Sequence, residues 1–84
     1  MKNKRLYDIP LGSRAVVEKI ESCGSIRRRL LDIGLTRGTE VECTLINPGG
    51  NLIAYMIRGA LIAIRDDDAK RILVEEIWHE KYRK

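Results

Sequence analysis

Residues 28–41 of this 84-residue chain read RRLLDIGLTRGTEV, and this stretch decides the fold. Its first half belongs to a predicted short helix over residues 25–34, whose apolar side chains recur at helical spacing. Ser25 suits the N-cap, where a hydroxyl accepts from a free backbone N–H, and Gly34 suits the left-handed residue that ends a helix. A helix this short is not stable alone, so we expect it to pack on the domain through one face, formed by Ile26, Leu30 and Ile33.

The second half of the stretch leads through a turn into a strand. Residues 36–38 read Thr-Arg-Gly, which is typical of a turn. Residues 40–45 then alternate between polar and apolar side chains, as in a strand with one face in the core and the other in water. The residues expected to face the core are Val41, Cys43 and Leu45.

Working outward, the rest of the chain divides into short elements separated by turn residues. Pro10 and Gly12 predict a turn over residues 8–12. The strongest loop signal is Asn47-Pro48-Gly49-Gly50-Asn51, and residues 66–70, which open with three aspartates, predict an N-capped helical turn. Besides the strand at 40–45, the sequence predicts four strands, over residues 14–20, 52–58, 60–65 and 72–77.

This order of elements predicts a mainly β fold. About five short strands with one inserted helix and one helical turn are typical of a small closed or nearly closed barrel, because closure removes exposed strand edges. The length allows one domain, residues 1–84, with a core over about 6–77 and a basic tail over 78–84. We expect the basic residues at both ends of the chain to be frayed and to favour solubility.

The composition bounds the compartment and the partners. Apolar residues make up 44% of the chain, and no apolar run approaches the roughly 20 residues that a transmembrane helix needs. The basic residues near the N-terminus are not followed by the apolar segment of a signal peptide, so we expect a cytoplasmic protein.

The positive charge is modest. There are 16 basic against 12 acidic residues, and Phe is absent, so stacking platforms for bases are scarce. We therefore expect no nucleic-acid partner, although a nucleic-acid-binding small barrel stays open as an alternative. Arg27, Arg28 and Arg29 fan over roughly 200° of a helix. They form either a solvated face or a contact for an acidic or phosphate-bearing partner.

The sequence offers little chemistry. Cys23, Cys43 and the single His79 lack metal-ligand spacing, so we predict no metal site and no cofactor. Cys43 is expected in the core and Cys23 as a free thiol. The aspartates at 66–68 lack the alternate spacing of a calcium loop. No nucleophile and base pair is convincing, so we expect no catalytic residues and no enzyme activity.

Three blocks of the sequence together resemble the FeoA family of small proteins associated with bacterial ferrous iron uptake. They are LYDIPLG at residues 6–12, RRLLDIGLTRGTEV at residues 28–41, and RGALIAIRDDDAKRILV at residues 58–74. The loop at 47–51 departs from the family pattern because it lacks a second proline.

The resemblance implies an SH3-like barrel and a role in transition metal ion transport. It implies a cytoplasmic accessory protein that binds the cytoplasmic region of FeoB, a membrane transporter with a GTP-binding domain. Such a protein would be recruited to the inner face of the membrane. The family domain also occurs in iron-dependent repressors, so a related regulatory domain is the other alternative. Direct iron binding is disfavoured, since His79 is the only histidine.

A protein-binding role needs exposed contacts on a rigid frame. The arginines would supply charge, the glycine-rich loop would supply an exposed tip, and the segment after the helix would supply an apolar contact. The predicted partner-binding residues are Arg28, Arg29, Leu35, Pro48, Gly49 and Asn51.

Overall fold

The computed structural model describes residues 4–78 of the chain. Six strands form one antiparallel sheet in the order β1-β6-β2-β3-β4-β5. The predicted mainly β class is therefore confirmed, with one strand more than expected. The elements in chain order are β1 (Lys4–Arg5), the 3-10 turn η1 (Leu6–Asp8), β2 (Arg14–Ile20), α1 (Gly24–Asp32), β3 (Glu40–Ile46), β4 (Leu52–Ile57), β5 (Ala60–Arg65), α2 (Asp66–Ala69) and β6 (Ile72–Trp78).

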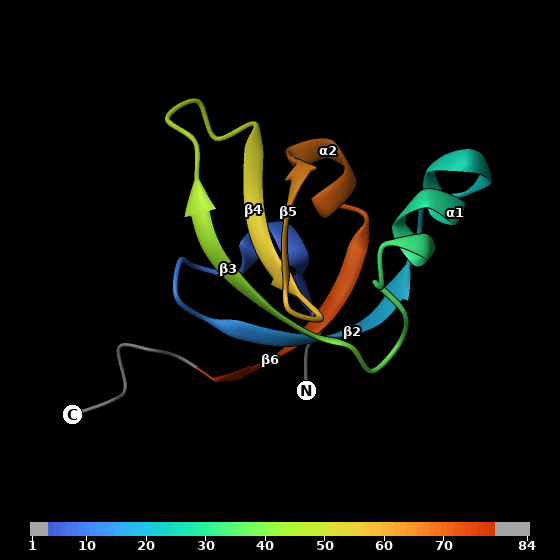
Figure 1. Ribbon diagram of the computed structural model, residues 1–84, viewed down its shortest axis with the longest axis horizontal. Coiled ribbons are helices and arrows are strands. Elements are labelled where there is room, and N and C mark those ends of the chain that lie inside the picture. The colour runs from blue at the N-terminus through green and yellow to red at the C-terminus, as the bar shows by residue number, and fades with distance from the viewer. Residues whose placement is uncertain (1–3, 79–84) are drawn as a thin grey trace.

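The sheet curls strongly around its core (Figure 1). The paired strands β2 and β6 run along the bottom of the view, β3, β4 and β5 rise above them, and α1 lies at the right. The Tyr55 hydroxyl donates to the backbone carbonyl of Leu6 over 3.1 Å. This buried hydrogen bond links the centre of β4 to η1 across the core. Among the described residues, the core cluster contains aliphatic side chains together with Tyr55 and Cys43.

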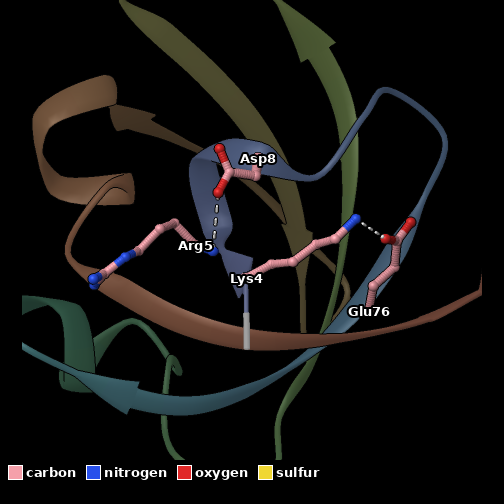
Figure 2. A network of polar contacts seen from close by, with 4 residues as sticks. All are labelled: Lys4, Arg5, Asp8 and Glu76. Atoms are coloured by element: carbon pink, nitrogen blue, oxygen red, sulfur yellow. Dashed lines mark hydrogen bonds and ion pairs between the residues drawn. The ribbon is translucent and has the colours of Figure 1, made fainter. Parts of the chain in front are cut away.

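The added strand, β1, corrects the prediction of frayed N-terminal basic residues for Lys4 and Arg5, while Lys2 lies outside the described residues. Lys4 and Arg5 pair with Val74 and Leu73 of β6. The Lys4 ammonium lies 2.7 Å from the Glu76 carboxylate, and the Asp8 carboxylate accepts from the Arg5 backbone N–H over 3.2 Å. Figure 2 shows both contacts. Two residues are too few to show the alternation of polar and apolar side chains that predicts a strand. The strand is therefore recognised from its pairing with β6 and could not be predicted from its own sequence.

A bulge in β3 overturns one prediction about the core. Val41 and Cys43 face inward as expected, whereas Leu45 is 60% exposed. Cys43 pairs with Tyr55 but Leu45 pairs with Ala54, so one extra residue is accommodated between them. Because side chains alternate with a period of two, that extra residue turns Leu45 to the outer face of the sheet.

The helix α1 differs from its prediction at its start. It begins at Gly24 with Cys23 as N-cap, so Ser25 lies inside the first turn and the predicted Ser25 cap is wrong. Ile26, expected on the buried face, is 40% exposed, while Leu30 is buried and Ile33 packs at the edge of the core. Only the C-terminal part of α1 therefore anchors it to the barrel.

The end of α1 follows its prediction closely. Gly34 has a φ of +110° and directly follows the last helical residues. The Leu35 N–H donates to the Leu30 carbonyl over 3.1 Å, and the Gly34 N–H donates to the Leu31 carbonyl over 3.0 Å. This pair of bonds is the Schellman arrangement, which satisfies the last helix carbonyls and turns the chain back onto the core.

The turns on either side of β5 lie close to their predicted positions. The predicted strand over 52–58 ends at Ile57, because Arg58 and Gly59 form the two-residue turn between β4 and β5. Both have positive φ, 51° and 84°, as a tight hairpin turn requires. The helical turn after β5 is present as α2, but its N-cap is Arg65 and the aspartates occupy its first turn.

No helix within residues 4–78 is long and apolar enough to cross a membrane.

Candidate functional site

The arginines of α1 lie on different sides of the helix. All three are exposed. Arg27 and Arg28 line one hollow, together with Asp32, whereas Arg29 lines a second hollow on the side of α1 that faces α2. This agrees with the predicted fan and means that Arg28 and Arg29 cannot both lie at the centre of one flat contact.

The second hollow is the α1–α2 cleft, which has a volume of about 560 Å³ and lies between α1 and the segment around α2. Arg29 approaches Asp68 there, with 3.8 Å between guanidinium nitrogen and carboxylate oxygen. The Arg29 side chain is 67% exposed and the Asp68 side chain is 12% exposed, so this pair contributes little and leaves Arg29 accessible.

The loop between β3 and β4 has a defined shape. The Asn47 side chain donates to the Asn51 side chain over 2.8 Å and accepts from the Leu52 backbone N–H over 3.1 Å. A backbone bond of 2.9 Å from Gly50 to Asn47 closes the turn. Pro48 and Gly49 are exposed at the tip. These hydrogen bonds fix the shape of the loop that carries Pro48 and Gly49.

The predicted contact residues do not form one cluster. In Figure 1 the β3–β4 loop rises at the upper left, and α1 lies at the right beyond β4, β5 and α2. Leu35, predicted as an apolar contact, is 0% exposed within the core. That prediction is corrected: the Schellman turn directs Leu35 inward, so it supports the α1–β3 connection and is closed to a partner.

Arg58 is a residue of structural importance that the sequence reasoning did not single out. From the β4–β5 turn, its guanidinium donates to the Gly34 carbonyl over 3.4 Å and to the hydroxyls of Thr36 and Thr39 over 3.3 and 3.4 Å. It therefore pins the end of α1 and the following turn to the sheet. The available signal was the Arg-Gly pair separating two apolar strands by two residues.

The two cysteines have different surroundings. Cys23 is exposed and Cys43 is buried, and both are free thiols. Burial and the nearby Glu42 carboxylate raise the pKa of the Cys43 thiol. Burial likewise raises the pKa of the Tyr55 hydroxyl. No group of three metal-ligating side chains occurs in the described part of the chain, and His79 lies outside it.

This difference predicts selective thiol reactivity. A thiol-specific disulfide reagent at pH 8 should modify Cys23 rapidly in the folded protein, because it is exposed, and leave Cys43 protected. Mass spectrometry should show one adduct under native conditions and two in denaturant. Cys23→Ser should leave no rapidly modified site, and rapid modification of Cys43 in the native state would contradict its burial.

Comparisons with known proteins agree with this architecture. The FeoA domain family matches residues 4–76. The chain is 30% identical over 73 residues to an Fe(2+) transport protein A/Fe(2+) transporter FeoB fusion protein of Porphyromonas gingivalis. That alignment covers 87% of this chain and 9% of the fusion protein, so the chain spans a small part of that relative.

Solved structures show the same fold. A FeoA-like protein of Clostridium acetobutylicum is 32% identical, with a TM-score of 0.85 and coverage of 95% of this chain and 93% of that one. FeoA of Stenotrophomonas maltophilia, described as a prokaryotic SH3 domain protein complexed with zinc, is 32% identical with a TM-score of 0.76. The alignment covers 86% of this chain and 89% of that one.

A manganese-dependent transcriptional repressor shares the fold at 18% identity, with a TM-score of 0.82 and coverage of 92% of this chain and 38% of that one. This likeness concerns the fold alone. The predicted SH3-like barrel is confirmed by the described strand order and by these neighbours. With its family match extending from β1 into β6, the chain belongs to the FeoA domain family, which is linked to ferrous iron transport.

Proposed function

We propose that this protein is an accessory module of bacterial ferrous iron uptake that docks on the cytoplasmic region of a FeoB-type transporter. The observation that supports this most strongly is the Porphyromonas gingivalis fusion, in which a related domain and a transporter share one polypeptide. Fusion keeps two domains at high effective concentration, which favours pairs that act together. The module would work in the cytoplasm at the inner face of the membrane.

The exposed arginines of α1 are the proposed charged contacts. Arg28 and Arg29 are both exposed, and within residues 4–78 Arg29 makes only the long ion pair with Asp68. A guanidinium that is free to reorient can pair bidentately with a carboxylate of the partner. These two side chains line different hollows on two sides of α1. We therefore expect α1 to insert between two acidic groups of the partner, and not to lie flat against the partner's surface.

The β3–β4 loop is the proposed second contact, through Pro48, Gly49 and Asn51. Its shape is fixed before binding by the hydrogen bonds of Asn47, so little conformational entropy would be lost on docking. The module needs no catalytic residues or cofactor for this role, since the binding surfaces alone would carry it.

The proposal is tested by NMR titration of the isotope-labelled protein with the purified cytoplasmic region of the transporter. We expect saturable shifts at the amides of residues 24–29, at those of residues 49–51, or at both, and none at the buried amides of β2 and β6. The two contact regions are far apart in the fold, so the map distinguishes one docking surface from two. If no shifts appear at high concentration, direct docking is wrong.

A salt-matched titration with a mixed-sequence oligonucleotide tests the alternative of nucleic-acid binding. Such binding would weaken steeply with salt concentration. We expect the oligonucleotide to cause no saturable shifts, because the described surface offers few aromatic side chains.

A further inference from the structure

The α1–α2 cleft gathers positive groups from separate parts of the chain. Arg29 comes from α1, Arg65 from the end of β5, and Arg71 from the residue before β6. All three are exposed and border a hollow of about 560 Å³. Arg65 and Arg71 form no ion pair or side-chain hydrogen bond with any residue in the range 4–78, so both guanidinium groups are available to a ligand.

The start of α1 borders the same cleft. Cys23 is the N-cap and, within the described residues, no side chain caps this end of the helix. The first N–H groups of a helix have no partner inside it and carry the positive end of its dipole. Cys23 and Ile26 line the cleft, whereas Gly24 and Ser25 of the same turn line the other hollow, so this end of α1 lies at the border between the two.

Ser22 supplies an independent observation. It is 8% exposed and lines the cleft, and its Oγ has no hydrogen-bond partner among the described residues. A buried hydroxyl without a partner is costly, so such groups are rare unless a ligand or water completes them. Because the Oγ itself is buried, it would have to rotate toward the cleft to donate to a bound oxyanion.

We propose that the α1–α2 cleft is a binding site for a phosphoryl group. Guanidinium groups, helix N–H groups and a hydroxyl are all donors, and they approach from several directions, which suits the tetrahedral oxygens of phosphate better than a planar carboxylate. Arg65 and Arg71 would bind the oxygens directly, and Arg29 would complete the site from α1. Inorganic phosphate and a nucleotide both present this chemistry.

The acidic residues of the cleft set the expected selectivity. Asp68 is largely buried and faces Arg29 at 3.8 Å, which offsets part of its charge. Asp67 is exposed on α2 and has no ion pair with the residues of the described region, so it would repel a bound anion. The Asp67→Asn variant should therefore bind phosphate about threefold more tightly, as expected for one partly screened like charge.

The test is an NMR titration of the full chain with inorganic phosphate at pH 7, with the ionic strength held constant by sodium chloride. We expect saturable shifts at the amides of residues 22–26 and at that of Arg71. Arg65→Ala and Arg71→Ala should each weaken binding about tenfold, the usual effect of losing one hydrogen bond to a charged group. Arg27→Ala is the matched control, since Arg27 lies on α1 but outside the cleft, and should bind as the unmodified protein does.

A parallel titration with GDP separates the two sources of phosphate. Saturation of the same amides by both ligands assigns the site to the phosphoryl group alone, and saturation by GDP only assigns it to a nucleotide phosphate. The proposal is overturned if neither ligand causes saturable shifts, or if the Arg65→Ala–Arg71→Ala variant responds as the unmodified protein does. Ser22→Ala should keep or raise the melting temperature while weakening phosphate binding, which a purely structural serine would not do.

Discussion

Replacing Leu35 with alanine is expected to lower the free energy of unfolding by about 2–5 kcal/mol. Leu35 is 0% exposed and belongs to the main core cluster, so truncation would leave a cavity in a small core. Its N–H also completes the Schellman turn with Leu30, so a relaxed position would loosen the end of α1. Domains of this size have roughly 5–15 kcal/mol of stability in total, which makes the expected loss severe.

Urea unfolding followed by circular dichroism measures this loss. Leu61→Ala is the matched control, since Leu61 is 58% exposed on β5 and its truncation should change stability by less than about 0.5 kcal/mol. The Leu35→Ala and Leu61→Ala variants also distinguish an effect on stability from an effect on partner binding. If Leu35 were a contact residue, Leu35→Ala would weaken partner binding with nearly unchanged stability, contrary to its burial.

The second large effect is expected at Gly34. Gly34→Ala should lower the free energy of unfolding by about 2–3 kcal/mol, since a side chain at positive φ costs 1–2 kcal/mol and crowding adds to it. The φ of Gly34 is +110°, and an added Cβ would lie 2.8 Å from Cδ of Arg58. The side chain of Arg58 would have to move, and it would lose its hydrogen bond to the Gly34 carbonyl.

A double-variant cycle identifies the crowding. Arg58→Ala removes the side chain that an alanine at Gly34 would meet, so Gly34→Ala should cost less in that background than in the unmodified protein. Gly49→Ala is the control, because Gly49 lacks positive φ and an added Cβ would meet only the Asn51 side chain at 3.4 Å. Equal costs for Gly34→Ala in both backgrounds would show that the backbone conformation alone sets the penalty.

The parts of the fold that local chemistry dictates were predictable from the sequence. Gly34 ended the helix as its conformational freedom suggested, and the loop at Asn47–Asn51 appeared where proline and glycines cluster. The three sequence blocks also led to the SH3-like barrel and to the correct family.

The parts that depend on distant pairing were not predictable. Leu45 faces outward because a bulge in β3 shifts its register against β4, and nothing in the local alternation marks that bulge. β1 exists because β6, some seventy residues later, supplies its partner. Arg58 fixes a turn more than twenty residues away through its side chain, a contact that sequence spacing does not reveal.

The candidate site shows the same division. The exposure of Arg28, Arg29 and the loop tip followed from their residue types, whereas the burial of Leu35 followed from the direction of the chain after Gly34. In the sequence, Arg65 and Arg71 are isolated arginines that belong to no basic cluster. The fold brings them to the same cleft as Arg29 and Ser22, and this grouping is visible only in three dimensions.

This barrel is proposed to dock on a FeoB-type transporter through the exposed arginines of α1. The most direct measurement is the dissociation constant for the transporter's cytoplasmic region, determined by isothermal titration calorimetry for the unmodified protein and for Arg28→Ala–Arg29→Ala. The control is Arg14→Ala–Lys70→Ala, which removes two charges from β2 and from the end of α2.

Loss of two charge-assisted contacts should weaken binding at least about tenfold in the α1 variant, with an unchanged melting temperature and control affinity close to that of the unmodified protein. Equal affinities for the unmodified protein and the α1 variant, or no binding by the unmodified protein, would contradict the claim.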